Sequence, residues 1–431
     1  MTDPVTTIVE PDSPAWTMPL DQIDVSDGYL FRDNTIDAYL ARLRRDAPVH
    51  YCAESRFGPY WSITRYRDIM KVEMNPTVFS SDGRRGSIAL SGMANPEGVS
   101  FIEMDPPEHD VRRKAVSPIA EPVNIGRLED TIRGHVREIV HGLPVGETFD
   151  WVERVSIELT TRMLATIFDF PFEERRQLTY WSDIATGHPK DAGPVTSHEM
   201  RAEELSRCLA VFTKMWNERV NEPPRTDLIS MMAHSPDTRD MTPGDFLSNL
   251  ILLIVGGNDT TRNSISGGLL ALHQNPAQYD KLRANPGLIK TLVPEIIRWQ
   301  TPLAHMARTA TQDIEFEGQT IRAGDRVALW YLSANRDESG WPRRSYASCG
   351  KSYSSRIRAF ACLVSPSGCC RTLCTAMCRC RYGSSRNNAR AVSRQGRPIR
   401  RYRPALFAYL FQVVTISPRS IRYSPLSSLL A

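Results

Sequence analysis

Acidic and basic residues are divided very unevenly along the chain, and this division limits which part can fold as a domain. All 49 Asp and Glu residues of the 431-residue chain precede residue 339. Segment 340–431 has no Asp, Glu or His, but it contains 16 Arg, one Lys, seven of the nine Cys and fifteen Ser. A folded domain mixes its charges and spaces its apolar residues regularly. We therefore expect one folded domain over 1–339 and an Arg-, Ser- and Cys-rich tail over 340–431, frameshifted or disordered.

The chain has the overall composition of a folded, soluble protein. Hydrophobic residues make up 41% of it, enough to bury a large core. Its first twenty residues, MTDPVTTIVEPDSPAWTMPL, carry acids and prolines where a secretory signal has basic residues and an apolar run. The longest apolar run, residues 250–255, is far too short to cross a bilayer. These features predict a cytoplasmic protein with no membrane insertion.

The spacing of apolar residues predicts a mainly α fold with small β-sheets. Apolar residues recur three and four positions apart, as in amphipathic helices, in residues 127–143, 151–170 and 199–220. Residues 48–54 and 58–66 instead alternate apolar and polar side chains around a Gly-Pro turn, which is typical of a hairpin. Residues 314–331 read as short strands with Gly318 and Gly324 in the turns. We expect small sheets at the two ends of a helical region.

The stretch LILLIVGGNDTTRNS, residues 250–264, breaks an apolar helix with polar residues. Gly256 and Gly257 remove side chains from one helix face, at a cost of about 1 kcal/mol each, so that a flat group can lie against the backbone. Asp259 and Thr260 place a carboxylate beside a hydroxyl, a pair that can hold water and transfer protons in a closed pocket. The same residues also fit a close helix–helix contact in which the Thr hydroxyls bond to the preceding turn. The motif alone leaves both interpretations open.

The stretch VPEIIRWQTPLAHMARTA, residues 293–310, contains a second candidate. Glu295 and Arg298 lie three positions apart, so they share a helix face and can pair. Their apolar neighbours favour a buried, bidentate pair that fixes geometry, although exposed pairs of this spacing are common and contribute little. Arg308, farther along, fits an exposed cation as well as it fits an anion ligand.

The stretch MDPPEHDVRRKAV, residues 104–116, contains the third. Its two prolines favour a helix start, which puts His109 and Arg113 one turn apart on one face. Two such groups can bind a carboxylate or a phosphate together. With Arg112 and Lys114 beside them, they equally fit a solvated basic face.

In combination and in this order, these clusters resemble the cytochrome P450 superfamily of haem-thiolate monooxygenases. The matching motifs are HxxxR at His109 and Arg113, (A/G)GxDTT at 256–261, ExxR at Glu295 and Arg298, the following Arg308, and NRD at 335–337. The resemblance covers about residues 20–339 and stops there. Within the superfamily, the sequences of these stretches are most similar to those of the soluble bacterial subfamily that hydroxylates the terminal carbon of medium-chain alkanes and fatty chains.

The resemblance implies a cytochrome P450 fold with haem b as cofactor. The roles that it implies are propionate binding by His109, Arg113 and Arg308, close approach to the haem by Gly256 and Gly257, catalytic proton delivery by Asp259 and Thr260, and a structural lock by Glu295 and Arg298. It also implies O₂ and a small apolar aliphatic substrate, held in a pocket that includes Leu253, Ile254 and Leu303. Electrons would come from a ferredoxin and its NAD(P)H-dependent ferredoxin reductase.

The sequence departs from the family where the iron ligand is expected. The family holds a Cys thiolate in a loop of the form FxxGxxxCxG, and the thiolate favours O–O cleavage. No such loop occurs here; by position alone the Cys would be Cys369 or Cys370, whose setting SPSGCCRTLC lacks the Phe and the Gly. The metal ligand is therefore unassigned, and the C-terminal part of the fold is missing or scrambled. The alternative function is a catalytically inactive P450 remnant with a non-functional basic tail.

Three interpretations of the tail are open: a frameshift, a metal site and a nucleic-acid-binding segment. The loss of every acid in favour of Arg, Ser and Cys is typical of a GC-rich gene read in a wrong frame. A metal site is a second, but Cys370, Cys374, Cys378 and Cys380 do not form paired C-x-x-C motifs and no His accompanies them. Sixteen arginines would also bind nucleic acid through phosphates. Such binding would follow from charge alone, so we expect no specific nucleic-acid partner.

Overall fold

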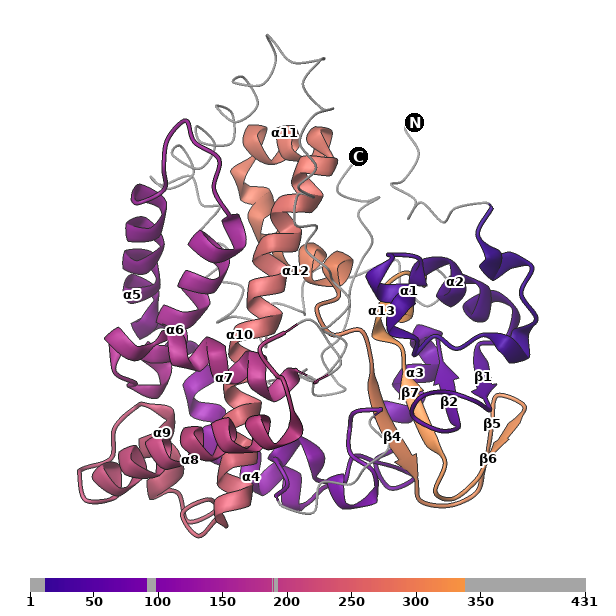
Figure 1. Ribbon diagram of the computed structural model, residues 1–431, viewed down its shortest axis with the longest axis horizontal. Coiled ribbons are helices and arrows are strands. Elements are labelled where there is room, and N and C mark those ends of the chain that lie inside the picture. The colour runs from indigo at the N-terminus through magenta and orange to yellow at the C-terminus, as the bar shows by residue number, and fades with distance from the viewer. Residues whose placement is uncertain (1–11, 91–97, 188, 190–192, 338–431) are drawn as a thin grey trace.

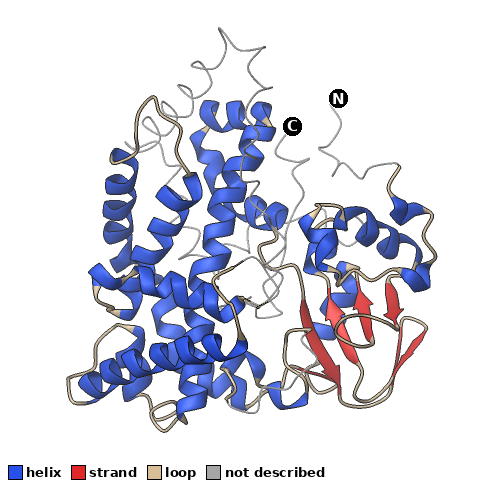
Figure 2. Cartoon of the chain, viewed as in Figure 1, coloured by secondary structure: helices blue, strands red, loops and turns tan. Residues whose placement is uncertain are grey.

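A computed structural model of the chain describes residues 12–90, 98–187, 189 and 193–337. A helical region lies beside a smaller region that contains the strands (Figures 1 and 2). The prediction of a mainly α fold with small sheets is confirmed. The predicted tail, 340–431, with Cys369, Cys370 and the other tail cysteines, lies outside the described residues.

The helical region contains most of the long helices. They are α4 (Glu108–Val116), α5 (Pro122–His141), α6 (Glu158–Phe168), α7 (Arg176–Thr186), α8 (His198–Val220), α9 (Leu228–His234), α10 (Pro243–Gln274), α11 (Pro276–Ala284) and α12 (Ile289–Gln300). The three stretches with helical spacing form α5, α6 and α8, and a π-helical turn over Val152–Ile157 leads into α6.

Helix α10 is the longest of the described helices, with 32 residues, and it runs through the middle of the helical region (Figure 1). It begins at Thr242, whose Oγ1 accepts a hydrogen bond of 3.1 Å from the Asp245 N–H, with Pro243 at the first position. Its apolar residues are buried against α6, α7 and α8, among them Leu250, Leu252 and Ile254. Because it is enclosed on several sides, polar residues on α10 are buried together with the core.

The strands form one main sheet and one hairpin. The main sheet has the order β1 (Val49–Cys52), β2 (Tyr60–Ile63), β7 (Arg326–Leu329), β4 (Met306–Ala310), β3 (Phe79–Ser80). The predicted N-terminal hairpin is present, with Val49 opposite Ile63. The C-terminal strands form as well, and the hairpin of β5 (Ile314–Phe316) and β6 (Gln319–Ile321) turns at Gly318, whose φ of +80° suits glycine.

The expectation of separate sheets at the two ends of the helical region is wrong. Strand β2 pairs in parallel with β7, which follows it by more than 260 residues, so both ends build one five-stranded sheet. The reason is burial: Ile63, Val327 and Leu329 are fully enclosed in the joined sheet. A two-stranded hairpin alone would leave such side chains in water.

The remaining α-helices flank the sheet. They are α1 (Gly28–Arg32), α2 (Ile36–Asp46), α3 (Tyr66–Glu73) and α13 (Tyr331–Ala334). The last described residues, which follow α13, are hydrogen-bonded to neighbouring elements. After α13, the Asn335 amide donates to Thr301 Oγ1 at 3.0 Å, and the Tyr66 N–H donates to Asp337 Oδ2 at 2.9 Å. The NRD turn is thus tied to the end of α12 and the start of α3. None of the helices described combines the length and the apolar character needed to cross a bilayer.

Candidate active site

Asp259 is a buried acid on α10 whose pKa lies near neutrality. Its carboxylate accepts hydrogen bonds from Arg262 Nη2 at 2.8 Å and from Ser182 Oγ on α7 at 3.3 Å. Burial raises the pKa of Asp259 to about 6; the charge of Arg262 opposes this rise and the charge of Asp183 adds to it. A carboxyl group with such a pKa can both bind and release a proton near pH 7.

Thr260 places a buried hydroxyl next to this acid. Its Oγ1 donates to the Gly256 carbonyl at 2.9 Å. This is the bond to the preceding helical turn that was one of the two interpretations of the motif. Asn258, on the other side of Asp259, donates to Asp259 Oδ1 at 3.1 Å and accepts from Thr160 Oγ1 at 2.7 Å. The acid and the hydroxyl are thus consecutive residues in a buried, hydrogen-bonded stretch of α10.

The two glycines of the motif are held in the packed interior of α10. A Cβ on Gly257 would lie 2.7 Å from Leu164 Cδ2 of α6, so a side chain there would force this contact to shift. The close helix–helix contact thus accounts for Gly257. Gly256 is buried in the same stretch, and its carbonyl accepts the Thr260 hydroxyl. Close approach of the pair to a haem stays a prediction.

His109 and Arg113 both lie on α4, as predicted, but they have different surroundings. The His109 ring Nδ1 lies 2.8 Å from Asp110 Oδ1, its exposed neighbour. Arg113 is half-buried, and its guanidinium bonds to none of the other residues described. Burial lowers the pKa of Arg113. The Arg113 guanidinium therefore has donors left for an external anion.

Arg308 on β4 is buried and already has an acidic partner. Its Nη2 donates to Glu73 Oε1 at 3.1 Å, and its Nη1 donates to the Ala307 carbonyl at 2.8 Å. The Tyr331 hydroxyl donates to the same oxygen of Glu73. Arg308 is therefore not an exposed cation, and a second anion would have to share it with Glu73.

Glu295 and Arg298 form the buried bidentate pair that their spacing allows. Arg298 Nε lies 2.9 Å from Glu295 Oε2, and its Nη2 lies 2.5 Å from Oε1. The remaining Nη1 donates to the Asn335 carbonyl in the NRD turn. The pair fixes the end of α12 to the segment after α13, which is a structural contact and not a catalytic one.

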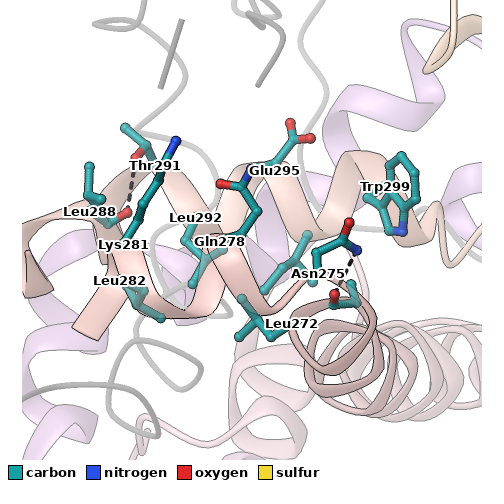
Figure 3. A pocket seen from close by; sticks show the side chains of 12 residues that line it. Leu272, Asn275, Gln278, Lys281, Leu282, Leu288, Thr291, Leu292, Glu295 and Trp299 are labelled. Atoms are coloured by element: carbon teal, nitrogen blue, oxygen red, sulfur yellow. Dashed lines mark hydrogen bonds between the residues drawn. The ribbon is translucent and has the colours of Figure 1, made fainter. Parts of the chain in front are cut away.

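A groove between the end of α10, α11 and α12 lies next to this pair (Figure 3). Its apolar lining includes Leu272, Leu282, Leu292 and Ile296, with Glu295 and Trp299 at one end. None of the residues predicted to line a substrate pocket is part of it. Instead, Leu253 and Ile254 belong to the core around α10, and Leu303 packs with Ile88 and Met306 in a separate cluster. Ile102 packs against both of these clusters and so connects them.

Sequence reasoning missed three residues that contact Asp259 or its arginine. Arg262 is nearly fully buried, and its Nη2 lies 3.2 Å from Asp183 Oδ1 on α7 as well as close to Asp259. Ser182 precedes Asp183 on the same helix. The three-residue spacing of Asp259 and Arg262, the same as that of Glu295 and Arg298, could have revealed the arginine. The α7 residues carry no such signal, because only the tertiary packing brings them to α10.

Comparison with known proteins identifies the family. A family model described as Cytochrome P450 matches residues 145–344. Linalool 8-monooxygenase of Pseudomonas putida is 34% identical over 330 residues, which cover 74% of this chain and 81% of that protein. The chain belongs to the cytochrome P450 family. The family match ends within a few residues of 339, where the sequence resemblance stops.

Two solved structures are similar to this P450 over most of its length. CYP153D17 from Sphingomonas sp. PAMC 26605 is 43% identical, with a TM-score of 0.72, covering 80% of this chain and 91% of that one. Cytochrome P450-153 from Novosphingobium aromaticivorans is 37% identical, with a TM-score of 0.68, covering 85% and 90%. The chain is thus a member of a family of monooxygenases, which are oxidoreductases whose cofactor is haem b.

The described residues of this P450 fit one part of a haem site and not another. The half-buried Arg113, with donors to spare, suits an anionic propionate. The two described cysteines, Cys52 and Cys208, are both buried; burial raises the pKa of Cys52 to about 11 and that of Cys208 still further. Each thiol is packed into a hydrophobic core cluster, so neither lies open to an iron ion. The candidates Cys369 and Cys370 lie outside the described residues.

Proposed function

We propose that this P450 is built for hydroxylation of the terminal C–H bond of medium-chain alkanes or fatty chains. The observation that carries the proposal is the buried pair of Asp259 and Thr260 on α10, in which a carboxyl with a pKa of about 6 lies beside a hydroxyl. Haem, when bound, supplies the iron at which O₂ is activated. Electrons come from a ferredoxin and its NAD(P)H-dependent reductase, and the protein acts in the cytoplasm.

The protein's own residues supply protons and position the cofactor. Asp259 takes a proton and releases it near neutral pH, because burial offsets the attraction of Arg262 for its ionised form. The Thr260 hydroxyl, which donates to the Gly256 carbonyl, is the second proton-handling group, because a hydroxyl can donate one hydrogen bond and accept others. Arg113 binds a propionate on α4. Asp259 is itself shielded from bulk water, since it is only 6% exposed.

An aliphatic substrate is supported by the apolar residues on both sides of Ile102. This side chain packs against the core cluster that contains Leu253 and against the small cluster of Leu303 and Met306. A surface of this kind binds hydrocarbon by the hydrophobic effect and offers it no hydrogen bonds. One relative is named linalool 8-monooxygenase, and this name agrees with oxidation of a small organic substrate.

Product analysis tests this function. The chain as it stands lacks the FxxGxxxCxG loop, so we expect little product from it. A variant in which this loop from a P450 relative replaces the tail is supplied with haem, ferredoxin, reductase and a medium-chain alkane. We expect the terminal alcohol, with the yield lowered by Thr260→Ala and by Asp259→Asn. Products oxidised only at internal carbons would contradict the proposal.

A second candidate function is a catalytically inactive P450 remnant. It is favoured by the missing loop and by the burial of the two described cysteines within the core. In that case the described residues fold and bind haem weakly or not at all. Translation of the gene beyond residue 339 in the other two frames tests its origin: a Phe-Gly-Cys loop in one of them indicates a frameshift, and its absence from both contradicts that origin.

A further inference from the structure

Arg262 on α10 is shared between two carboxylates that lie on different helices. Its Nη2 is 2.8 Å from Asp259 Oδ1 and 3.2 Å from Asp183 Oδ1 of α7. The side chains of Arg262 and Asp259 are 4% and 8% exposed, whereas that of Asp183 is 33% exposed. One cation therefore serves an enclosed acid and an acid that reaches water.

Asp183 and Arg262 have opposing effects on the protonation of Asp259. Facing Asp259 are Ser182 and Asp183 from α7 and Asn258 and Arg262 from α10; α6 adds Thr160, which bonds to Asn258. Arg262 favours the ionised form of Asp259. Burial and the negative charge of Asp183 favour the protonated form. The pKa of Asp183 is itself raised by burial, and Arg262 opposes that rise too.

We propose that Arg262 and Asp183 are positioning residues for proton transfer at Asp259, with the position and charge of Asp183 setting how readily Asp259 binds a proton. The inference rests on the proposed role of Asp259 in proton delivery. The guanidinium stays charged and carries no proton itself. While Asp183 is ionised and in place, it shares Arg262 and repels the charge on Asp259, so protonated Asp259 is favoured. Neutralising Asp183 leaves Arg262 to Asp259 and favours the carboxylate.

An NMR titration of the full-length chain, isotopically labelled at its aspartate carboxyl carbons, tests this directly. The Asp259 signal is assigned as the one missing from Asp259→Asn. Arg262→Gln removes the cation, so we expect the midpoint of Asp259 to rise by about one pH unit or more. Asp183→Asn removes the repulsion, so we expect the midpoint to fall. Arg262→Lys keeps the charge and should hold the midpoint near that of the unmodified chain.

Opposite shifts are the result that a purely structural role would not produce. The matched control is Arg162→Gln, because Arg162 also bridges two carboxylates, those of Glu158 at 2.7 Å and Glu138, but on α6; it should leave the midpoint unchanged. Shifts of the same sign in Arg262→Gln and Asp183→Asn, or no shift in either, would overturn the proposal. If Arg262→Gln does not fold, the test uses Asp183→Asn and Arg262→Lys. The proposal is then overturned if Asp183→Asn raises the titration midpoint of Asp259 or leaves it unchanged.

The titration needs neither haem nor substrate. A failure of the loop-restored chain to hydroxylate alkanes would therefore count against the proposed function and leave the link between α7 and α10 standing. An Asp259 titration midpoint that does not change when Arg262 and Asp183 are substituted would count only against the proposed positioning role of these two residues.

Discussion

Helices α10 and α12 present polar groups that have partners within the protein, whereas α4 presents a cation with no hydrogen-bond partner in the part of the chain that the structure describes. Asp259 has Arg262 and Ser182, and Glu295 has the guanidinium of Arg298. The guanidinium of Arg113 on α4 is half-buried and makes no hydrogen bond to the other residues described. The first group is held by packing of the chain against itself. On the proposal that Arg113 binds a haem propionate, its partner comes from outside the chain, so the two sides should respond differently to substitution.

The largest effect is expected on the partnered side, from Arg298→Ala. The substitution leaves Glu295 buried with its charge uncompensated and releases the NRD turn at Asn335. We expect the free energy of unfolding to fall by about 3–5 kcal/mol. Arg207→Ala is the control, because Arg207 pairs with Glu203 and Glu204 on the exposed face of α8 and should cost less than about 1 kcal/mol. Equal losses of unfolding free energy in Arg298→Ala and Arg207→Ala, measured by urea titration, would contradict the expected difference between the buried and the exposed pair.

Asp259 should give stability a dependence on pH. Its pKa is about 6 in the folded chain and 3.8 in the unfolded one, so the folded chain binds the proton more tightly. The resulting stabilisation is fully present below the unfolded value and is lost as the pH rises through about 6. We expect the stability of the unmodified chain, relative to Asp259→Asn, to fall by about 2 kcal/mol between about pH 4 and about pH 7. A difference that does not change with pH in unfolding titrations would show that the acid is not held as described.

Gly257→Ala tests the contact between α10 and α6. The new methyl group would press on Leu164, so we expect a loss of about 1–2 kcal/mol in thermal or urea unfolding. Gly134→Ala on α5 is the matched control: a Cβ there meets nothing within 4 Å, and the helix should gain up to about 1 kcal/mol. Adding Leu164→Ala to Gly257→Ala should relieve the overlap. A gain from Gly257→Ala would exclude a tight contact.

The smallest effect on stability is expected on the open side, from Arg113→Gln. Since the Arg113 guanidinium bonds to none of the other residues described, we expect the free energy of unfolding without haem to change by less than about 0.5 kcal/mol. Affinity in a haem titration should nevertheless fall about tenfold or more, because a charge-assisted bond to a propionate is lost. Arg112→Gln, which removes a bond to the Asp237 carbonyl, serves as control and should retain haem affinity. Equal haem affinity in all three proteins would remove Arg113 from the site.

The sequence predicted those features that depend on neighbours along the chain. The helical spacing located α5, α6 and α8, alternation located the hairpin of β1 and β2, and the i, i+3 spacing placed Glu295 beside Arg298. Contacts between distant segments were out of reach. The parallel pairing of β2 with β7, the Arg308–Glu73 ion pair and the approach of Asp183 to Arg262 each join elements whose separation in sequence gives no local signal.

The absorption spectrum of the haem-supplemented, full-length chain, reduced and exposed to carbon monoxide, tests the account most directly. The chain has the P450 fold and the buried Asp259 proposed for proton transfer, but its sequence lacks the loop that supplies a thiolate to the iron. We expect an unshifted Soret band, or no bound haem. A strongly red-shifted band would prove a thiolate on the iron, contradict the account, and make Cys369 or Cys370 the ligand to be tested next.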